Sequence, residues 1–275
     1  MSTPKTAPYG SWKSPITSEL IVAQSVALSE TRLDGNKFYW LEGRPQEQGR
    51  FVVVGAGSSG RKPIDQTPMP YNARTRVHEY GGASWTVADG VVYFSDFADG
   101  RLYSKQAGAA NPRALTPAPP TRQRQWRFAD GVIDPARKRW IGVREDHTGA
   151  GEPRNTIVTV DLARPGREPG SVIVEGHDFF SAPRLSPDGK KLIWLAWDHP
   201  NMPWNGTTLY LAGLETTGTV RNPQVIAGGP AESIFQPEWS PDGRAIFFVS
   251  DRSNWWNLYR YDIATATTEP LAPFD

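Results

Sequence analysis

Short runs of aromatic and β-branched residues recur along the chain, separated by turns rich in glycine, proline and aspartate. The clearest runs are residues 38–41, 91–94, 140–143, 192–197 and 246–249. Between the runs no segment keeps the 3.6-residue apolar period of a helix, apart from residues 17–23, where Thr17 or Ser18 is suited to cap a short helix. The pattern predicts an all-β protein with few helices.

The turns between these runs repeat at a nearly constant interval. The tetrapeptide Ser-Pro-Asp-Gly occurs at residues 186–189 and 240–243, and Asp34-Gly35, Asp89-Gly90 and residues 134–137 take the same place in the other units. Successive turns lie about 47 to 55 residues apart, and each unit has room for four short strands. This period is typical of the four-stranded blades of a β-propeller. Five blades are predicted, at residues 26–68, 80–117, 126–175, 179–228 and 232–275.

Two arrangements are compatible with five units. In the first, the N-terminal segment (residues 1–25) completes or caps a blade, and the five blades close into a ring. In the second, the chain is an incomplete part of a seven-bladed propeller. The first and last blades would then each expose an apolar sheet face, which predicts self-association. The periodicity fits both arrangements.

Composition and charge exclude several classes of function. The chain has no cysteine, so it has no disulfide, thiolate metal site or cysteine nucleophile. Its 30 basic and 29 acidic residues give no electrostatic footprint for nucleic acid. No apolar run approaches the roughly 20 residues that span a bilayer, and the first residues lack the apolar core of a signal peptide. We therefore expect a cytoplasmic protein that binds neither nucleic acid nor membrane.

Motifs for catalysis and metal binding are not found. The nucleophile-elbow pattern Gly-x-Ser-x-Gly is absent, as are metalloprotease and calcium-loop patterns. The four histidines lie in separate loops, so we interpret them as hydrogen-bonded loop residues and predict no metal and no cofactor. Glycosidase chemistry would need carboxylates converging on the propeller axis. We expect small or apolar residues there, which ranks that function last.

The longest and most varied loops fall on one face of the predicted propeller. In a blade, the loop after the second strand and the connector after the fourth strand emerge on the same face, which we call the decorated face. Arginine, histidine, glutamate and tryptophan concentrate there, as on a contact surface. The candidate contact residues are Arg76, His78, Glu79, His199, Trp204, Glu232, Trp255 and Trp256. The three tryptophans could equally fill gaps between blades.

Several of these loop sequences resemble a known family. The matching segments are residues 9–17, 74–82, 143–147, 181–189, 197–204, 232–243 and 250–259. They are similar to the N-terminal propeller of prolyl-oligopeptidase-type serine peptidases, in the branch of dipeptidyl aminopeptidases and acylaminoacyl peptidases. The resemblance implies a propeller, usually seven-bladed, followed by an α/β-hydrolase domain with a Ser-Asp-His triad. It therefore implies that the present chain contains no catalytic residue and lacks about two blades and the hydrolase domain.

The resemblance also implies a role and partners. In the family the propeller restricts access to short peptides, and in some members its acidic residues hold the amino terminus of the substrate. Glu79 and Glu232 are candidates for such an acid by position on the decorated face alone. The favoured hypothesis is a non-catalytic, substrate-gating propeller whose partners are the hydrolase domain and short peptides. The alternative is a stand-alone propeller that serves as a binding scaffold.

Overall fold

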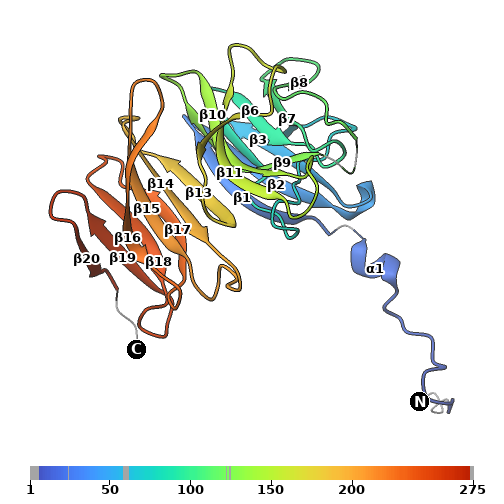
Figure 1. The fold of residues 1–275 in the computed structure, drawn as a ribbon. Helices are drawn as coiled ribbons and strands as arrows, with labels where there is room; N and C mark the ends of the chain where they lie inside the picture. Colours follow the sequence, from blue (N-terminus) through green and yellow to red (C-terminus); the bar gives the residue numbers. More distant parts are fainter. Residues whose placement is uncertain (1–5, 24, 58–61, 122, 124, 273–275) are drawn as a thin grey trace.

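The computed structural model describes residues 6–23, 25–57, 62–121, 123 and 125–272. It contains five antiparallel sheets, each made of four strands that are consecutive in the sequence (Figure 1). Among the described residues the helical elements are α1 (Ser18–Val22) and the short 3-10 helix η1 (Pro45–Glu47). The prediction of an all-β propeller with five four-stranded blades is confirmed. No helix in the described part of the chain is long and apolar enough to cross a membrane.

The five blades follow one another along the chain. Blade 1 consists of β1 (Ala27–Asp34), β2 (Lys37–Arg44), β3 (Arg50–Gly57) and β4 (Ile64–Asp65). Blade 2 consists of β5 (Trp85–Ala88), β6 (Val91–Ser95), β7 (Leu102–Gln106) and β8 (Arg113–Ala114). Blade 3 consists of β9 (Trp126–Asp134), β10 (Arg139–Asp146), β11 (Arg154–Asp161) and β12 (Ser171–Val174). Blade 4 consists of β13 (Phe179–Leu185), β14 (Lys191–Trp197), β15 (Thr208–Leu214) and β16 (Val220–Gly228). Blade 5 consists of β17 (Ile234–Trp239), β18 (Ala245–Ser250), β19 (Asn257–Asp262) and β20 (Thr267–Pro270).

The N-terminal segment contains the short helix that its sequence predicts. Thr17 is the N-cap of α1, and its hydroxyl oxygen accepts a hydrogen bond from the Leu20 amide at 3.1 Å. The described residues before β1 add no strand to any of the five sheets. Figure 1 shows α1 lying away from the blades.

The Ser-Pro-Asp-Gly turns have the same geometry in blades 4 and 5. In blade 4, the Ser186 hydroxyl donates to Asp188, whose carboxylate also accepts from the Lys190 amide. The Ser186 oxygen accepts in turn from the Lys191 amide, and Gly189 has a φ of +70°. Blade 5 repeats these contacts 54 residues later in the chain, from Ser240 to Asp242. The motif is therefore a turn device, because every polar side chain in it bonds within the turn.

The hydrophobic core lies between the blades. In the described part of the chain there are four clusters of buried apolar side chains. Each joins two consecutive blades, as where Ile193 of blade 4 packs against Ile246 and Phe248 of blade 5. A closed ring of five blades would need five such interfaces, so the five blades form an open arc. Blades 1 and 5 are the ends of this arc (Figure 1).

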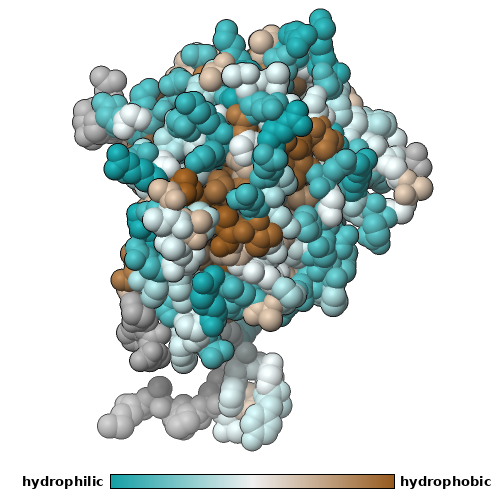
Figure 2. All heavy atoms as spheres, turned by 60° about the vertical axis from the view of Figure 1, so that its left-hand side comes forward, coloured by the Kyte–Doolittle hydropathy of each residue, from teal (hydrophilic) through white to brown (hydrophobic). Residues whose placement is uncertain are grey.

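The last blade leaves one face of its sheet uncovered. Phe235, Val249 and Leu258 are cross-strand partners and therefore share a face. Phe235 is 58% exposed and Leu258 is 42% exposed. Figure 2, in which the side of the molecule that holds blade 5 is turned forward, shows hydrophobic residues gathered in a patch surrounded by hydrophilic ones. We call this surface the open face of blade 5.

The first strands of the blades carry charged residues around the axis. Arg32 of β1 interacts electrostatically with Asp130 of β9, Arg184 of β13 and Glu238 of β17, which places these first strands around one centre. Burial raises the pKa of Glu30, also on β1, to about 7. The expectation of small or apolar residues at the axis is therefore wrong, since charges of opposite sign compensate one another there.

Two of the axial carboxylates are engaged in structural contacts. Asp130 accepts hydrogen bonds at 2.8 Å from the amides of Ala83 and Ala182, which ties blade 3 to blades 2 and 4. Glu238 accepts from the Arg184 guanidinium at 2.8 Å. These bonds hold the innermost strands together, and they leave no pair of free carboxylates of the kind that glycosidase chemistry uses among Glu30, Asp130 and Glu238.

Candidate functional site

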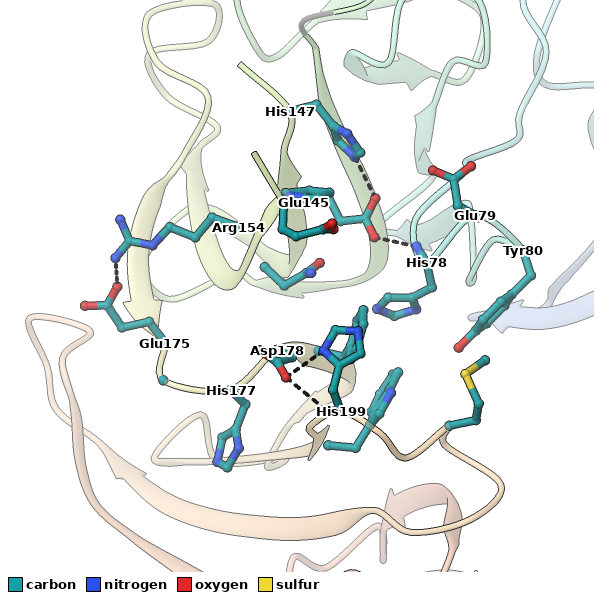
Figure 3. Close-up of a pocket in the computed structure, with 17 residues that line it drawn as sticks. His78, Glu79, Tyr80, Glu145, His147, Arg154, Glu175, His177, Asp178 and His199 are labelled. Carbon is teal, nitrogen blue, oxygen red and sulfur yellow. Dashed lines mark hydrogen bonds and ion pairs between the residues drawn. The ribbon is translucent and has the colours of Figure 1, made fainter. Parts of the chain in front are cut away.

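A large open cavity of about 1010 Å³ lies on the decorated face. Its walls come from the connector between blades 1 and 2, the β10–β11 loop, the connector between blades 3 and 4, and the β14–β15 loop (Figure 3). All four histidines of the chain line it. The lining residues are His78, Glu79, Tyr80, Glu145, His147, Glu152, Pro153, Arg154, Asn155, Glu175, Gly176, His177, Asp178, Phe179, Trp197, His199 and Met202.

A buried carboxylate, Glu145 at the end of β10, organises one side of the cavity. Its side chain is 4% exposed and accepts from the His78 amide at 2.5 Å. The other oxygen lies 3.1 Å from His147 Nε2 and 3.4 Å from Arg127 Nη1. Arg127 also donates to Glu79 at 2.6 Å, and this hydrogen bond is the main cause of the lowered pKa of Glu79. Glu145 thereby fixes the loop that presents His78 and Glu79.

His78 occupies a turn that L-residues adopt infrequently. His78 and Glu79 have φ values of +57° and +65°, in the left-handed region. The imidazole packs edge-on against Trp197, with ring centroids 5.0 Å apart. Burial lowers the pKa of His78, although the nearby Glu145 carboxylate opposes the shift. His78 is therefore neutral at neutral pH, and its buried Nε2 atom has no hydrogen-bond partner.

On the opposite side of the cavity, two further histidines are fixed by carboxylates. His199 Nδ1 lies 2.8 Å from Asp178 Oδ2, and the His199 amide donates to the same oxygen at 2.9 Å. This backbone hydrogen bond is the main cause of the lowered pKa of Asp178. His177 lies between Asp198 at 2.7 Å and the Tyr210 hydroxyl at 2.9 Å. The connector between blades 3 and 4 and the β14–β15 loop are thus tied to each other.

The cavity is acidic. Five of its lining residues are carboxylates (Glu79, Glu145, Glu152, Glu175 and Asp178), whereas Arg154 is the only arginine or lysine among them. Arg154 forms an ion pair with Glu175 at the outer edge (Figure 3). In the described part of the chain no group of three or more His, Asp or Glu side chains is arranged to hold a metal ion. The arrangement suits a cationic organic ligand better than an anion.

The structure brings together some of the candidate residues and separates others. His78, Glu79 and His199 line the cavity, and Trp204 lies beside it with its ring 6.3 Å from that of Tyr80. Trp204 is 58% exposed, so it does not fill a gap between blades.

The remaining candidates lie outside the cavity. Arg76 lies over the Phe97 ring at 5.4 Å, and Glu232 pairs with Arg252 at 2.7 Å. Trp255 and Trp256 are 61% and 53% exposed in the β18–β19 loop, so neither side chain packs between blades.

Several cavity residues are not among the sequence candidates. Glu145, Tyr80 and Trp197 lie within segments that match the family, residues 143–147, 74–82 and 197–204, but none of them is among the individual candidates. Trp197 ends a buried strand, and nothing in its sequence context shows that it borders a cavity. No pattern in the sequence shows that the four histidines meet, because they come from four different loops, two that connect blades and two within a blade.

Comparison with solved structures identifies close structural relatives. A puromycin-hydrolyzing peptidase of Mycobacterium tuberculosis superimposes with a TM-score of 0.86 and 34% identity, covering 98% of this chain and 42% of that chain. A puromycin hydrolase S511A mutant complexed with PGG superimposes with a TM-score of 0.87 and 36% identity, again covering 98% of this chain and 42% of that chain. A structure from a study of two prolyl endopeptidases gives 0.63 at 13% identity, covering 91% of this chain and 37% of that chain, and shows the fold alone.

Curated relatives are more distant. The Tol-Pal system protein TolB of Xylella fastidiosa (strain M12) is 24% identical over 253 residues, covering 85% of this chain and 52% of the relative. TolB of Xanthomonas oryzae pv. oryzae (strain MAFF 311018) is 25% identical over 244 residues, with the same coverage. No family model matches the chain.

The chain matches only part of the length of these relatives. The chain spans about half the length of the curated relatives and about two fifths of the puromycin hydrolases. Within that span the similarity extends over nearly the whole arc of five blades. The expectation from the loop sequences is confirmed, because the chain is similar over 98% of its length to puromycin hydrolases and covers 42% of theirs, as the N-terminal β-propeller of a prolyl-oligopeptidase-type peptidase would.

Proposed function

We propose that the chain is the non-catalytic, substrate-gating part of a serine peptidase that cleaves short peptides. In this proposal a C-terminal α/β-hydrolase domain of the complete polypeptide supplies the nucleophile, the base and the oxyanion hole. The observation that carries the proposal is the 34–36% identity to puromycin hydrolases over 98% of this chain but only 42% of theirs. The finer assignment, to dipeptidyl aminopeptidases or acylaminoacyl peptidases, rests on the loop sequences alone.

The topology supports a position for the hydrolase domain. The first strand of each blade begins, and the fourth ends, at the decorated face. A domain that follows the last blade would therefore emerge at that face, over the acidic cavity. The cavity would then form part of the space between the two domains, where a short peptide could be held.

The open face of blade 5 supports further blades in the complete polypeptide. Blades bury their two apolar faces against neighbours, and no blade in the described part of the chain covers the row of Phe235, Val249 and Leu258. About two more blades, followed by the hydrolase domain, would complete the seven-bladed pattern of the family.

Single-cysteine labelling tests the position of the decorated face, because this chain has no cysteine of its own. Trp204→Cys places a thiol beside the cavity, and Ala136→Cys places one in the β9–β10 turn on the opposite face. In the complete polypeptide, freed of other reactive thiols, a bulky maleimide at position 204 is expected to slow hydrolysis of aminoacyl nitroanilides. The same label at position 136 is expected to leave hydrolysis unchanged. Equal effects of the two labels would contradict the assignment of the face.

A stand-alone binding scaffold is the second candidate. The 24–25% identity to TolB over 83–85% of this chain favours it. The two functions differ in one measurable property, since a scaffold has no reason to show peptidase activity in the complete polypeptide. Hydrolysis by the complete polypeptide, with none by the 275-residue chain, would decide for the peptidase.

A further inference from the structure

A continuous wall of aromatic rings borders the acidic cavity. Trp197 and Phe179 are stacked with centroids 5.4 Å apart, and His199 lies 4.9 Å from Phe179. The ring of His78 packs edge-on against both stacked rings, 5.0 Å from Trp197 and 5.8 Å from Phe179, and the ring of Tyr80 lies 5.6 Å from His78. These five rings come from the connector between blades 1 and 2, from the first residue of β13, and from the end of β14 with the loop after it, so only the folded arc assembles them.

Accessible negative charge lies beside the rings. The side chains of Glu79 and Asp178 are 73% and 48% exposed, so a ligand can reach both carboxylates. Each uses one oxygen in the contacts that fix it, Glu79 with Arg127 and Asp178 with His199. Figure 3 shows both residues at the border of the same space, together with His78 and Tyr80.

His78, the buried histidine of the aromatic wall, does not repel a cationic ligand. Burial lowers the pKa of His78, so its imidazole is neutral at neutral pH. Its Nε2 atom is buried without a hydrogen-bond partner, which leaves the ring as an aromatic surface. A neutral aromatic wall beside exposed carboxylates is the environment in which organic cations bind, through the ring faces and through ion pairing.

We propose that this cavity binds the basic side chain of a peptide, a guanidinium or an alkylammonium group, between the aromatic wall and the carboxylates of Glu79 and Asp178. The description of the ligand as a peptide substrate rests on the proposed function. The cation pocket itself is a property of these residues and can be measured on the 275-residue chain alone. It recognises a side chain, so it does not require a free amino terminus on the ligand.

Two blocked amino acids separate charge from shape. Nα-acetyl-arginine N-methylamide carries the guanidinium and has no free amino terminus, and Nα-acetyl-citrulline N-methylamide has nearly the same shape without the charge. In calorimetric titrations at low salt, the arginine probe is expected to bind about tenfold more tightly, because cation–π contacts and ion pairing with the carboxylates favour the charged probe alone. Raising the salt concentration should weaken the arginine probe only.

Variants locate the binding. Tyr80→Leu removes an exposed ring, and Glu79→Gln removes an exposed charge; each is expected to weaken arginine binding about three- to tenfold. Phe235→Leu and Glu269→Gln make the same chemical changes on blade 5, away from the cavity, and are expected to leave binding unchanged. Circular dichroism and thermal unfolding of all four variants show whether each remains folded.

The inference and the proposed function fail in different ways. Three results would overturn the cation pocket: equal binding of the two probes, no binding of either probe at about 10 mM, or equal losses of binding in the control variants. None of these results bears on where the hydrolase domain lies. Conversely, arginine binding by the 275-residue chain would stand even if labels at positions 204 and 136 affected hydrolysis equally.

Discussion

The two faces of blade 5 contain similar residues and have opposite environments. On one face Phe248 and Tyr259 are 0% and 6% exposed, packed against blade 4. On the other face Phe235 and Leu258 remain 58% and 42% exposed. Leu258 lies on β19, next to Tyr259, and Phe235 lies on the neighbouring strand β17. Side chains alternate between the faces of a strand, so the sequence supplies apolar residues to both. The comparison indicates that the sheet of blade 5 has apolar residues for packing against a blade on each face, whereas in the described structure only blade 4 packs against it.

The largest expected difference between the two faces is in stability. Phe248→Ala is expected to lower the free energy of unfolding by about 3 to 5 kcal/mol, because it opens a cavity between blades 4 and 5. Leu258→Ala, on the open face, is expected to change it by less than about 1 kcal/mol. Urea unfolding followed by tryptophan fluorescence measures both. Similar losses for the two variants would show that the open face is packed in solution.

The two ends of the arc differ in charge at one bulge position of the first strand. The first strand of blade 1 carries Glu30 where that of blade 5 carries Gln236, and both residues have positive φ values at a β-bulge. Burial raises the pKa of Glu30 to about 7 from 4.5. The folded state therefore holds a proton that the unfolded state has lost between these pH values, so stability falls as pH rises from about 4.5 to 7.

Glu30→Gln removes this pH dependence and gives blade 1 the residue of blade 5. The variant is expected to be more stable than the wild type above pH 7, by up to about 3 kcal/mol, since one pKa unit corresponds to about 1.4 kcal/mol. Near pH 4.5 the two proteins should be equally stable. Urea unfolding at pH 4.5, 6 and 8 measures the difference, and a gain of the same size at every pH would contradict the role of the charge.

The smallest expected effect is on association. The open face of blade 5 should cause the 275-residue chain to self-associate, and replacing Phe235 and Leu258 by serine should weaken that association about tenfold, which is 1.4 kcal/mol. Sedimentation velocity over a range of concentrations measures it. The double substitution of Tyr9 and Trp12 by serine, in the exposed N-terminal segment, is the control. A wild-type chain that stays monomeric at all concentrations would show that its open face drives no association.

Most of the fold follows from the sequence because its signals are local. The turn Ser186–Gly189 and its counterpart at Ser240 bond within themselves, so a short motif determines the geometry. The cap of α1 by Thr17 is equally local. The continuous apolar run of β18 (Ala245–Ser250) predicts a sheet buried on both sides, and hence a neighbour on each face.

The remainder depends on contacts between distant segments. Asp130 bonds to amides in blades 2 and 4, and no neighbouring residue indicates these partners. The acidic cavity has the same origin, since Glu145 holds the backbone of His78, 67 residues earlier in the chain. Topology identified the face on which the cavity lies. It did not identify the aromatic wall, because the rings meet only after the blades have packed.

Amide hydrogen exchange, compared between the 275-residue chain and the complete polypeptide, tests the central claim most directly. If further domains cover the decorated face and the open face of blade 5, exchange should slow at least about tenfold in residues 75–82, 145–152 and 198–206, and in β19 and β20. The turns at residues 187–190 and 241–244, on the opposite face, should exchange at the same rate in both proteins. Slower exchange in those turns, with the loops of the decorated face unchanged, would contradict the claim.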